Sequence, residues 1–129
     1  TCMDARLETG RMLGLEEGDA HVIRNAGGIV TDDVIRSLMI SQHLLGTREV
    51  LVIHHTGCGM IGLPEADLCD KLERETGQRP SFDIGAFADL ESDVRDSVER
   101  IRSSPFVAEK EGIRGFVFEV ETGRLREVS

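Results

Sequence analysis

Two short stretches of the chain carry residue types that bind zinc. Residues 1–6 read Thr-Cys-Met-Asp-Ala-Arg, and residues 55–58 read His-Thr-Gly-Cys. Cys2, His55 and Cys58 offer two thiolates and one imidazole, a set that leaves the fourth position of a tetrahedral zinc ion open. An open position is typical of a catalytic zinc rather than of a sealed structural one. Each stretch alone is a weak signal, and their pairing is what predicts a zinc (Zn2+) site.

The chemistry of such a site suits a small electrophilic carbon. Zinc binds deprotonated thiolates and a neutral imidazole. The metal lowers the pKa of water in the open position toward neutrality. Zinc-bound hydroxide is then available as a nucleophile.

Asp4 and Arg6 stand beside the first cysteine and suggest how the site is controlled. If residues 2–6 are extended, positions 2, 4 and 6 point the same way. Asp4 can then pair with Arg6, which holds the carboxylate off the metal and leaves it free to accept a proton. Released from Arg6, Asp4 can take the fourth position and close the site. The alternative interpretation is a surface salt bridge that contributes little.

His54 and His55 compete for the ligand role. Successive residues of a strand face opposite ways, so at most one of the two is expected to bind the metal. The His-x-x-Cys spacing favours His55, which leaves His54 as a packed or hydrogen-bonded strand residue. His21 and His43 are expected to be structural or surface residues.

Three stretches have the apolar spacing and the end signals of helices. The first is capped by Thr31 and ends before Gly46, and the others span Pro64–Thr76 and Asp89–Ser103. The residues expected to face the core are Val34, Ile35, Leu38, Met39 and Leu45 in the first helix, Leu68, Cys69 and Leu72 in the second, and Leu90, Val94, Val98 and Ile101 in the third.

Four stretches are predicted to be strands: Ala20–Arg24, Val50–Ile53, Gly115–Val120 and Leu125–Val128. The run at 50–53 is continuously apolar, as in a parallel strand buried on both faces. Ligand sites in such sheets lie beyond the carboxyl ends of the strands, which is where His55 and Cys58 follow. The last two strands are separated by a turn and predict an antiparallel edge. The fold class predicted is α/β, in three αβα layers with a mostly parallel central sheet.

Length and charge limit the remaining possibilities. A chain of 129 residues fits a single domain, residues 1–129. The net charge of −9 argues against nucleic acid as a partner, because phosphate contacts need a basic surface. No apolar run reaches the length of a membrane span. Three cysteines do not make a disulfide framework, which favours a reducing, cytoplasmic compartment.

The two motifs resemble those of the β-class carbonic anhydrases, which are Cys-x-Asp-x-Arg and His-x-x-Cys. They stand here at residues 2–6 and 55–58, and Arg24–Gly28 and Gly59-Met60 also match that family. The segments Val30–Gly46 and Arg114–Val128 are similar to a bacterial, short-chain branch of it. The resemblance extends over essentially the whole chain.

This resemblance implies reversible hydration of carbon dioxide to bicarbonate and a proton. Cys2, His55 and Cys58 would be the zinc ligands, and Asp4 and Arg6 the catalytic pair, with Asp4 as fourth ligand in a closed state. The backbone amide of Gly59 would bind substrate. The resemblance also implies a homodimer or a dimer of dimers, with the active site at the subunit boundary.

One expectation concerns what precedes Thr1. The family has a central strand directly before the first motif and a helical arm before that strand, and the sequence shows neither. The chain is therefore expected to be N-terminally incomplete.

Two other functions stay open at this point. A hydrolase of carbonyl sulfide or carbon disulfide resembles the same family and uses the same zinc ligands, so the motifs do not separate the substrates. A non-catalytic zinc-binding module, with Asp4 permanently closing the site, is the second alternative.

Overall fold

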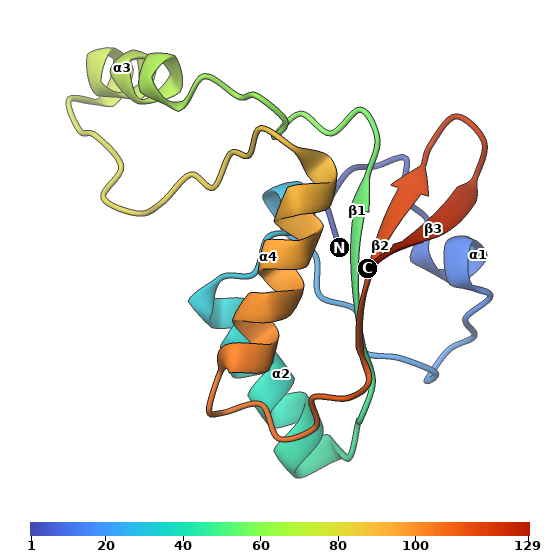
Figure 1. Cartoon of the computed structure of the whole chain (residues 1–129). Coiled ribbons are helices and arrows are strands. Elements are labelled where there is room, and N and C mark those ends of the chain that lie inside the picture. Colours follow the sequence, from blue (N-terminus) through green and yellow to red (C-terminus); the bar gives the residue numbers. More distant parts are fainter.

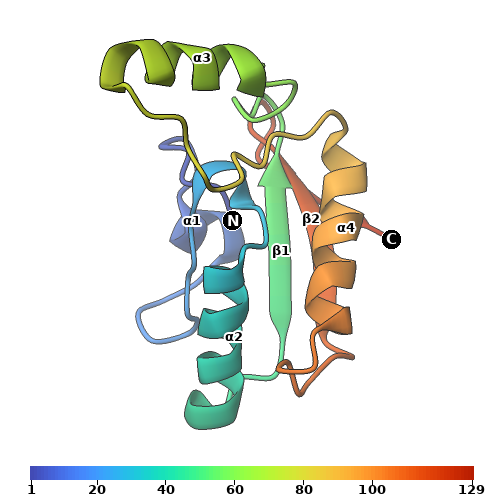
Figure 2. The same cartoon turned by 90° about the vertical axis from the view of Figure 1, so that its left-hand side faces the viewer.

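Helices and strands alternate along most of the chain. The computed structural model describes all 129 residues. In chain order the elements are α1 (Thr9–Leu13), the 3-10 turn η1 (Ala26–Gly28), α2 (Asp32–Leu45), β1 (Val50–His55), α3 (Glu65–Thr76), α4 (Leu90–Ser103), β2 (Ile113–Glu119) and β3 (Arg124–Val128). Helices α2 and α4 lie on one side of the sheet and α1 on the other (Figures 1 and 2).

The sheet has three strands in the order β1-β2-β3. β1 runs parallel to β2, with Val50 opposite Ile113 and His55 opposite Phe118. β3 returns antiparallel to β2 at the edge. The predicted α/β class and the antiparallel C-terminal strand are confirmed, in a sheet that is mixed. β1 is two residues longer than predicted, because its ladder with β2 continues through both histidines.

The strand predicted at Ala20–Arg24 does not form. Backbone pairing beside it is limited to one isolated parallel bridge, between Asn25 and Cys2. A cavity of about 720 Å³, lined by residues 20–23, by 50–53 of β1 and by α2, separates this segment from the sheet. The segment has no strand alongside it, so its ladder hydrogen bonds are not made.

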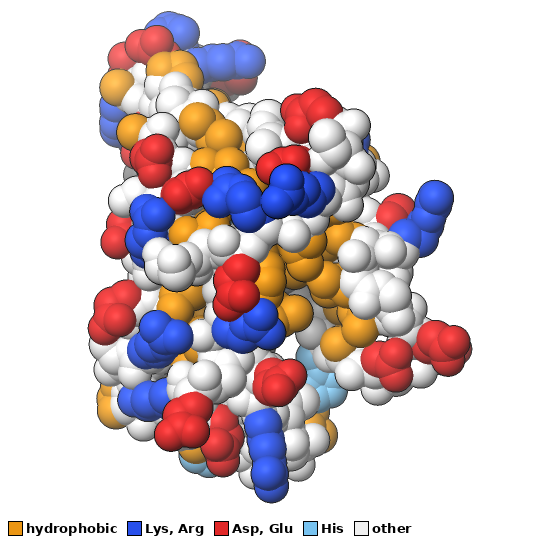
Figure 3. All heavy atoms as spheres, turned by 45° about the vertical axis from the view of Figure 1, so that its right-hand side comes forward, with side chains coloured by type: hydrophobic (Ala, Val, Ile, Leu, Met, Phe, Trp, Pro, Cys, Tyr) orange, Lys and Arg blue, Asp and Glu red, His pale blue; other side chains and the backbone are white.

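Figure 3 shows a face of the molecule on which hydrophobic side chains gather in a hollow between charged ones.

Helix α4 supplies the largest contact with the sheet, and its predicted stripe is confirmed. Val94, Val98 and Ile101 are buried, and Leu90 is half-buried. The helix lies very close to β2 at Gly115, where an added Cβ would lie 2.5 Å from a methyl group of Val94. Glycine at this position therefore lets α4 approach the strands that carry the site.

Helix α2 begins and ends where the sequence predicts. The Thr31 hydroxyl accepts a hydrogen bond from the Val34 N–H, and Gly46 ends the helix in the left-handed conformation. Val34, Ile35 and Leu38 pack on the main core cluster. The prediction that Leu45 faces the core is wrong, because it is the last residue of α2 and is 61% exposed.

The prediction that Leu68, Cys69 and Leu72 of helix α3 face the core is wrong. None of its residues is buried, and these three are only half-buried. Local signals suffice to form it, with Glu65 and Asp67 in its first turn and a left-handed Gly77 after its last. It projects from the body of the fold as an arm (Figures 1 and 2). None of the helices is both long and apolar enough to cross a membrane.

Candidate metal centre

The backbone around Cys2 is held from two sides. The Thr1 hydroxyl donates to the carbonyl oxygen of Ile53 in β1 at 2.6 Å. On the other side the Met3 N–H donates to the Asn25 carbonyl at 2.7 Å, and the Asn25 N–H donates to the Thr1 carbonyl at 3.2 Å. Cys2 is thereby fixed near the carboxyl end of β1, and it is buried.

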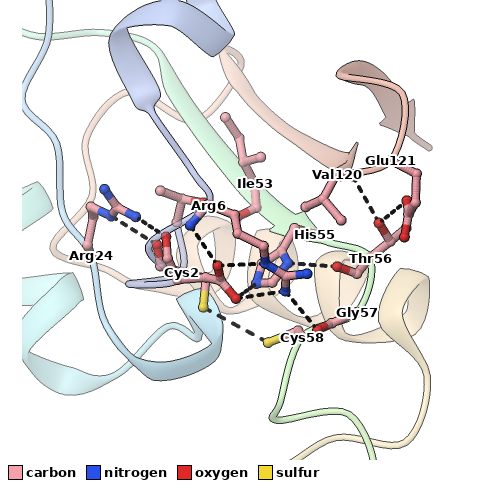
Figure 4. Close-up of polar contacts among 12 residues, drawn as sticks. Cys2, Arg6, Arg24, Ile53, His55, Thr56, Gly57, Cys58, Val120 and Glu121 are labelled. Atoms are coloured by element: carbon pink, nitrogen blue, oxygen red, sulfur yellow. Dashed lines mark hydrogen bonds and ion pairs between the residues drawn. The ribbon is translucent and has the colours of Figure 1, made fainter.

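The guanidinium of Arg24 secures the residues that follow. Its Nε donates to the carbonyl oxygen of Cys2 at 2.9 Å and its Nη2 to that of Asp4 at 2.8 Å (Figure 4). A planar guanidinium offers donors in a fixed fork, so the two carbonyl groups are held in one orientation. Arg24 therefore sets the course of the loop that carries Cys2 and Asp4.

The end of β1 brings in the second stretch. His55 is the last residue of the strand, and the chain then turns through Gly57, whose φ of 65° is a conformation that suits glycine. Thr56 ties this turn to the loop after β2, because its hydroxyl donates to Glu121 at 2.9 Å and accepts from the Val120 N–H at 3.0 Å. The turn delivers Cys58 to the same place as Cys2.

The three predicted ligands meet. One ligand atom from each of Cys2, His55 and Cys58 lies within 4.8 Å of the others, and all three residues are buried. The two sulfur atoms are 4.0 Å apart. Two thiolates on one tetrahedral zinc ion would be roughly 3.8 Å apart at ordinary zinc–sulfur lengths. The spacing therefore fits a shared metal ion.

The one hydrogen bond of the His55 ring leaves its Nε2 atom free to bind a metal ion. Its Nδ1 lies 2.8 Å from the Thr56 carbonyl oxygen, so this nitrogen carries the proton. Its Nε2 is buried without a hydrogen-bond partner. A buried, unpartnered lone pair close to two thiols suits metal binding, and a carbonyl group on the other nitrogen is the usual support of a ligating histidine.

Burial of the two thiols also calls for a cation. Loss of solvent raises the pKa of the Cys58 thiol, and the neighbouring Cys2 adds to this effect. Without a positive partner the Cys58 thiol therefore favours its neutral form, and a metal ion would reverse that preference. The donor set and its surroundings fit Zn2+.

Asp4 and Arg6 form the predicted pair, although not on an extended segment. The Leu7 N–H donates to the Asp4 carbonyl oxygen at 3.0 Å, which closes a turn. The Asp4 carboxylate accepts from Arg6 Nε at 3.0 Å and Nη2 at 2.9 Å, and also from the Arg6 backbone N–H at 2.9 Å. The turn, rather than strand alternation, brings the two side chains together.

This pair lies at the donor cluster. Asp4 Oδ2 is 3.8 Å from His55 Nε2, and Arg6 also donates to the Gly57 carbonyl oxygen at 3.0 Å (Figure 4). Hydrogen bonds from Arg6 lower the pKa of the Asp4 carboxyl far below its usual range. Asp4 is therefore ionised at neutral pH and can only accept hydrogen bonds.

The other residues singled out in the sequence lie as follows. Gly59 follows Cys58 directly and is exposed, and its φ is not in the left-handed region. His21 is hydrogen-bonded to Ser41, and His43 to the Phe106 carbonyl oxygen. Neither histidine belongs to the donor cluster.

His54 occupies the opposite face of β1 from His55. Its side chain is fully buried, and its ring stacks on Phe87 with the centroids 5.5 Å apart. Its Nδ1 lies 3.4 Å from Oδ2 of Asp93, a residue in the first turn of α4. His54 is thus the packed and hydrogen-bonded residue that the sequence predicts.

Sequence reasoning did not find Thr56, Glu121 or Asp93. An acid in the first turn of a helix is ordinary, so nothing in the sequence separates Asp93 from Glu91 beside it. Thr56 and Glu121 are far apart in the chain, and only the parallel pairing of β1 with β2 joins them.

Comparison with known proteins identifies the family. A family model described as carbonic anhydrase matches residues 1–79. The β-carbonic anhydrase 1 of Mycobacterium tuberculosis is 56% identical over 128 residues, which cover 99% of this chain and 78% of that protein. The chain belongs to the β-carbonic anhydrase family.

Two further relatives show how far this family likeness extends. The crystal structure of the carbonic anhydrase from Streptococcus mutans superposes with a TM-score of 0.93 at 46% identity, covering 99% of this chain and 78% of that one. A carbon disulfide hydrolase of Acidithiobacillus thiooxidans is 36% identical, over 97% of this chain and 73% of that protein. Membership of this enzyme family agrees with the resemblance inferred from the two motifs.

We expect substitution of Asp93 by asparagine to change stability in a pH-dependent way. Burial, and then the nearby charge of Asp96, raises the pKa of Asp93 from 3.8 to about 6. Its folded-state pKa is above the unfolded value, so its contribution is full below pH 4 and is lost as pH rises through 6. Relative to the parent, Asp93→Asn should gain about 1 kcal/mol between pH 5 and pH 8, a value discounted for partial solvent exposure. Urea unfolding at fixed metal content measures this gain, and a difference that is constant with pH would contradict it.

Proposed function

We propose that this chain catalyses the reversible hydration of carbon dioxide to bicarbonate and a proton, with zinc held by Cys2, His55 and Cys58. The observation that carries the proposal is the meeting of these three donors, within 4.8 Å of one another, beside the Asp4–Arg6 pair. Family membership supports the same reaction, since relatives that are 56% identical over 128 aligned residues are named as β-carbonic anhydrases.

The metal and the side chains would divide the chemistry. Zinc on two thiolates and an imidazole supplies a Lewis acid that makes water acidic near neutral pH. Asp4 is held by both oxygens in the fork of Arg6, so its carboxylate cannot rotate freely. As a fixed acceptor it would hold the O–H of the attacking water and aim the oxygen lone pair at the carbon of the substrate. The backbone N–H of Gly59 would bind a substrate oxygen.

The Asp4–Arg6 pair would also decide whether the site is open. In the structure Asp4 is paired with Arg6, and Oδ2 lies 3.8 Å from His55 Nε2. Loss of the pairing would leave this carboxylate free to take the remaining ligand position. That closed arrangement is the basis of the non-catalytic alternative.

A second candidate function is hydrolysis of carbon disulfide or carbonyl sulfide. The observation that favours it is the 36% identity to carbon disulfide hydrolases. Carbon dioxide is the stronger candidate because the mycobacterial relatives are 56% identical. Both reactions would use the same zinc donors. They differ in the size of the substrate molecule that the site must admit.

Rates on competing substrates test this proposal. We expect the zinc-loaded chain to hydrate carbon dioxide in a stopped-flow assay and to release little sulfide from carbonyl sulfide or carbon disulfide. Asp4→Asn should lower hydration about 100-fold or more, because it removes the charged acceptor. The matched control is Asp33→Asn, which breaks an exposed Asp–Arg pair on α2 and should leave the rate unchanged. Sulfide release with negligible hydration would overturn the choice of substrate.

Removal of one thiol tests the ligand set. We expect Cys58→Ser to abolish stoichiometric zinc binding, because a hydroxyl is a much poorer zinc ligand than a thiolate. Cys69→Ser is the matched control, since Cys69 lies on α3 outside the cluster and zinc content should be unchanged. Zinc content measured by atomic spectroscopy gives the answer. Zinc retained at one ion per chain in Cys58→Ser would show that the ligand is another residue.

We also propose that residues 1–129 act as one catalytic domain and assemble as a homodimer or a dimer of dimers. Large apolar side chains remain exposed, Leu44 by 76%, Phe82 by 73% and Phe106 by 59%, and the α3 arm buries none of its residues. The three cysteines are free, which agrees with a reducing compartment such as the cytoplasm. Light scattering that gives a monomer at micromolar concentration would count against assembly.

A further inference from the structure

His54 lies directly behind the donor cluster and is not needed as a ligand. Its side chain is 0% exposed. Besides stacking on the ring of Phe87, it makes two polar contacts. Nε2 lies 3.2 Å from the carbonyl oxygen of Gly28, and Nδ1 faces Asp93. Burial of an imidazole destabilises the fold unless its nitrogen atoms make hydrogen bonds. If His54 only filled space, a leucine of similar size would therefore be more stable at this position.

The Gly28 carbonyl leads directly to the first ligand. Gly28 has a φ of 69°, and a Cβ built on it would lie 2.8 Å from the backbone nitrogen of Cys2. The Gly28 N–H also donates to the Asn25 carbonyl at 3.3 Å, and Asn25 is bridged to Cys2. The turn at Gly28 and the backbone of Cys2 are therefore in van der Waals contact, and a shift of one must move the other.

The hydrogen-bond inventory fixes the orientation of the imidazole. A carbonyl oxygen only accepts, so Nε2 must donate to Gly28. Nδ1 and Asp93 Oδ2 then face each other at 3.4 Å, and neither atom has another hydrogen-bond partner. One proton between them satisfies both atoms. Burial raises the pKa of Asp93 to about 6, which agrees with its holding a proton more readily than a surface carboxyl.

These contacts form a continuous path from α4 to the donor cluster. Asp93 orients His54, His54 holds the Gly28 turn, and the turn supports the backbone of Cys2. The neighbouring residue on β1, His55, is itself a donor of the cluster. His54 thus links the position of Cys2 to that of strand β1, which carries His55 and leads into the turn that holds Cys58.

We propose that His54 is a positioning residue of the metal centre, which holds the Gly28 turn so that Cys2 Sγ stays within reach of the ion bound by His55 and Cys58. This inference rests on the proposed function only in taking zinc as the ion. It assigns no chemical step to His54.

Paired substitutions at His54 test the proposal through metal binding. His54→Leu removes the donor to Gly28, and His54→Gln keeps an N–H₂ group able to reach the same carbonyl oxygen. Zinc affinity would be measured by competition with a chromophoric chelator, and site geometry by the absorption bands of the cobalt-substituted protein. We expect His54→Leu to weaken zinc about 10- to 100-fold and to shift the cobalt bands, and His54→Gln to recover affinity to within about threefold of the parent.

The matched control is His43→Leu. His43 is an exposed histidine that is also bonded to a backbone carbonyl oxygen, that of Phe106, and its replacement should alter neither readout. A folded His54→Leu protein with parental zinc affinity and parental cobalt bands would overturn the proposal. So would a His54→Gln protein that binds zinc as weakly as His54→Leu.

If His54→Leu does not fold, Asp93 supplies a second pair of variants. Asp93→Asn keeps a donor toward Nδ1 and should bind zinc like the parent, whereas Asp93→Ala should bind several-fold more weakly. Equal zinc affinity in both variants would overturn the proposal. Measurements on the unsubstituted protein separate the role of His54 from the proposed function. If this protein binds zinc but hydrates no carbon dioxide, the proposed reaction is refuted, and the zinc affinities of the variants still test the role of His54.

Discussion

The hold on the backbone around Cys2 is the constraint on which the rest of the site depends. His55 and Cys58 are adjacent to one strand and its turn, so their relative position is set locally. Cys2 comes from a distant part of the sequence, and hydrogen bonds to Ile53 on one side and Asn25 on the other help to bring its sulfur to 4.0 Å from that of Cys58. The guanidinium of Arg24 then fixes the carbonyl groups of the same loop. These hydrogen bonds therefore hold the Cys2 thiol close to the Cys58 thiol and to the unpartnered nitrogen of His55.

Alternation along β1 separates two roles for two adjacent histidines. His55 faces the thiols and Asp4, and its Nε2 is free to bind a metal ion. His54 faces α4 and the Gly28 turn, where it is held by hydrogen bonding and by stacking on Phe87. Gly115 contributes from the next strand, because its missing side chain allows α4 to approach closely enough to bring Asp93 near His54. One strand thus presents a candidate ligand, His55, on one face and, on the other, the histidine that we propose positions the site.

The meeting of Cys2, His55 and Cys58 and the pairing of Asp4 with Arg6 could be predicted from the sequence, because candidate zinc donors and ion pairs are recognisable by residue type and spacing. The boundaries of α2 and α4 also follow from local end signals, such as Thr31 and Asp89 as N-caps. Features that depend on residues distant in the sequence do not follow from local signals. The strand at Ala20–Arg24 does not form because a cavity lies where a neighbouring strand would have to be. Leu68 and Leu72 have helical spacing, but spacing does not reveal whether a helix has a surface to pack on. The pairing of Asp4 with Arg6 was predicted from an extended segment and arises from a turn instead.

X-ray absorption at the zinc edge of the metal-loaded chain would test the assignment of Cys2, His55 and Cys58 as zinc ligands, because it counts the atoms bound to the ion. We expect two sulfur ligands at about 2.3 Å and two lighter ligands at about 2.0–2.1 Å, one of them an imidazole nitrogen. A spectrum with no sulfur ligand, with one sulfur, or with four would contradict the assignment of Cys2, His55 and Cys58 as the metal site.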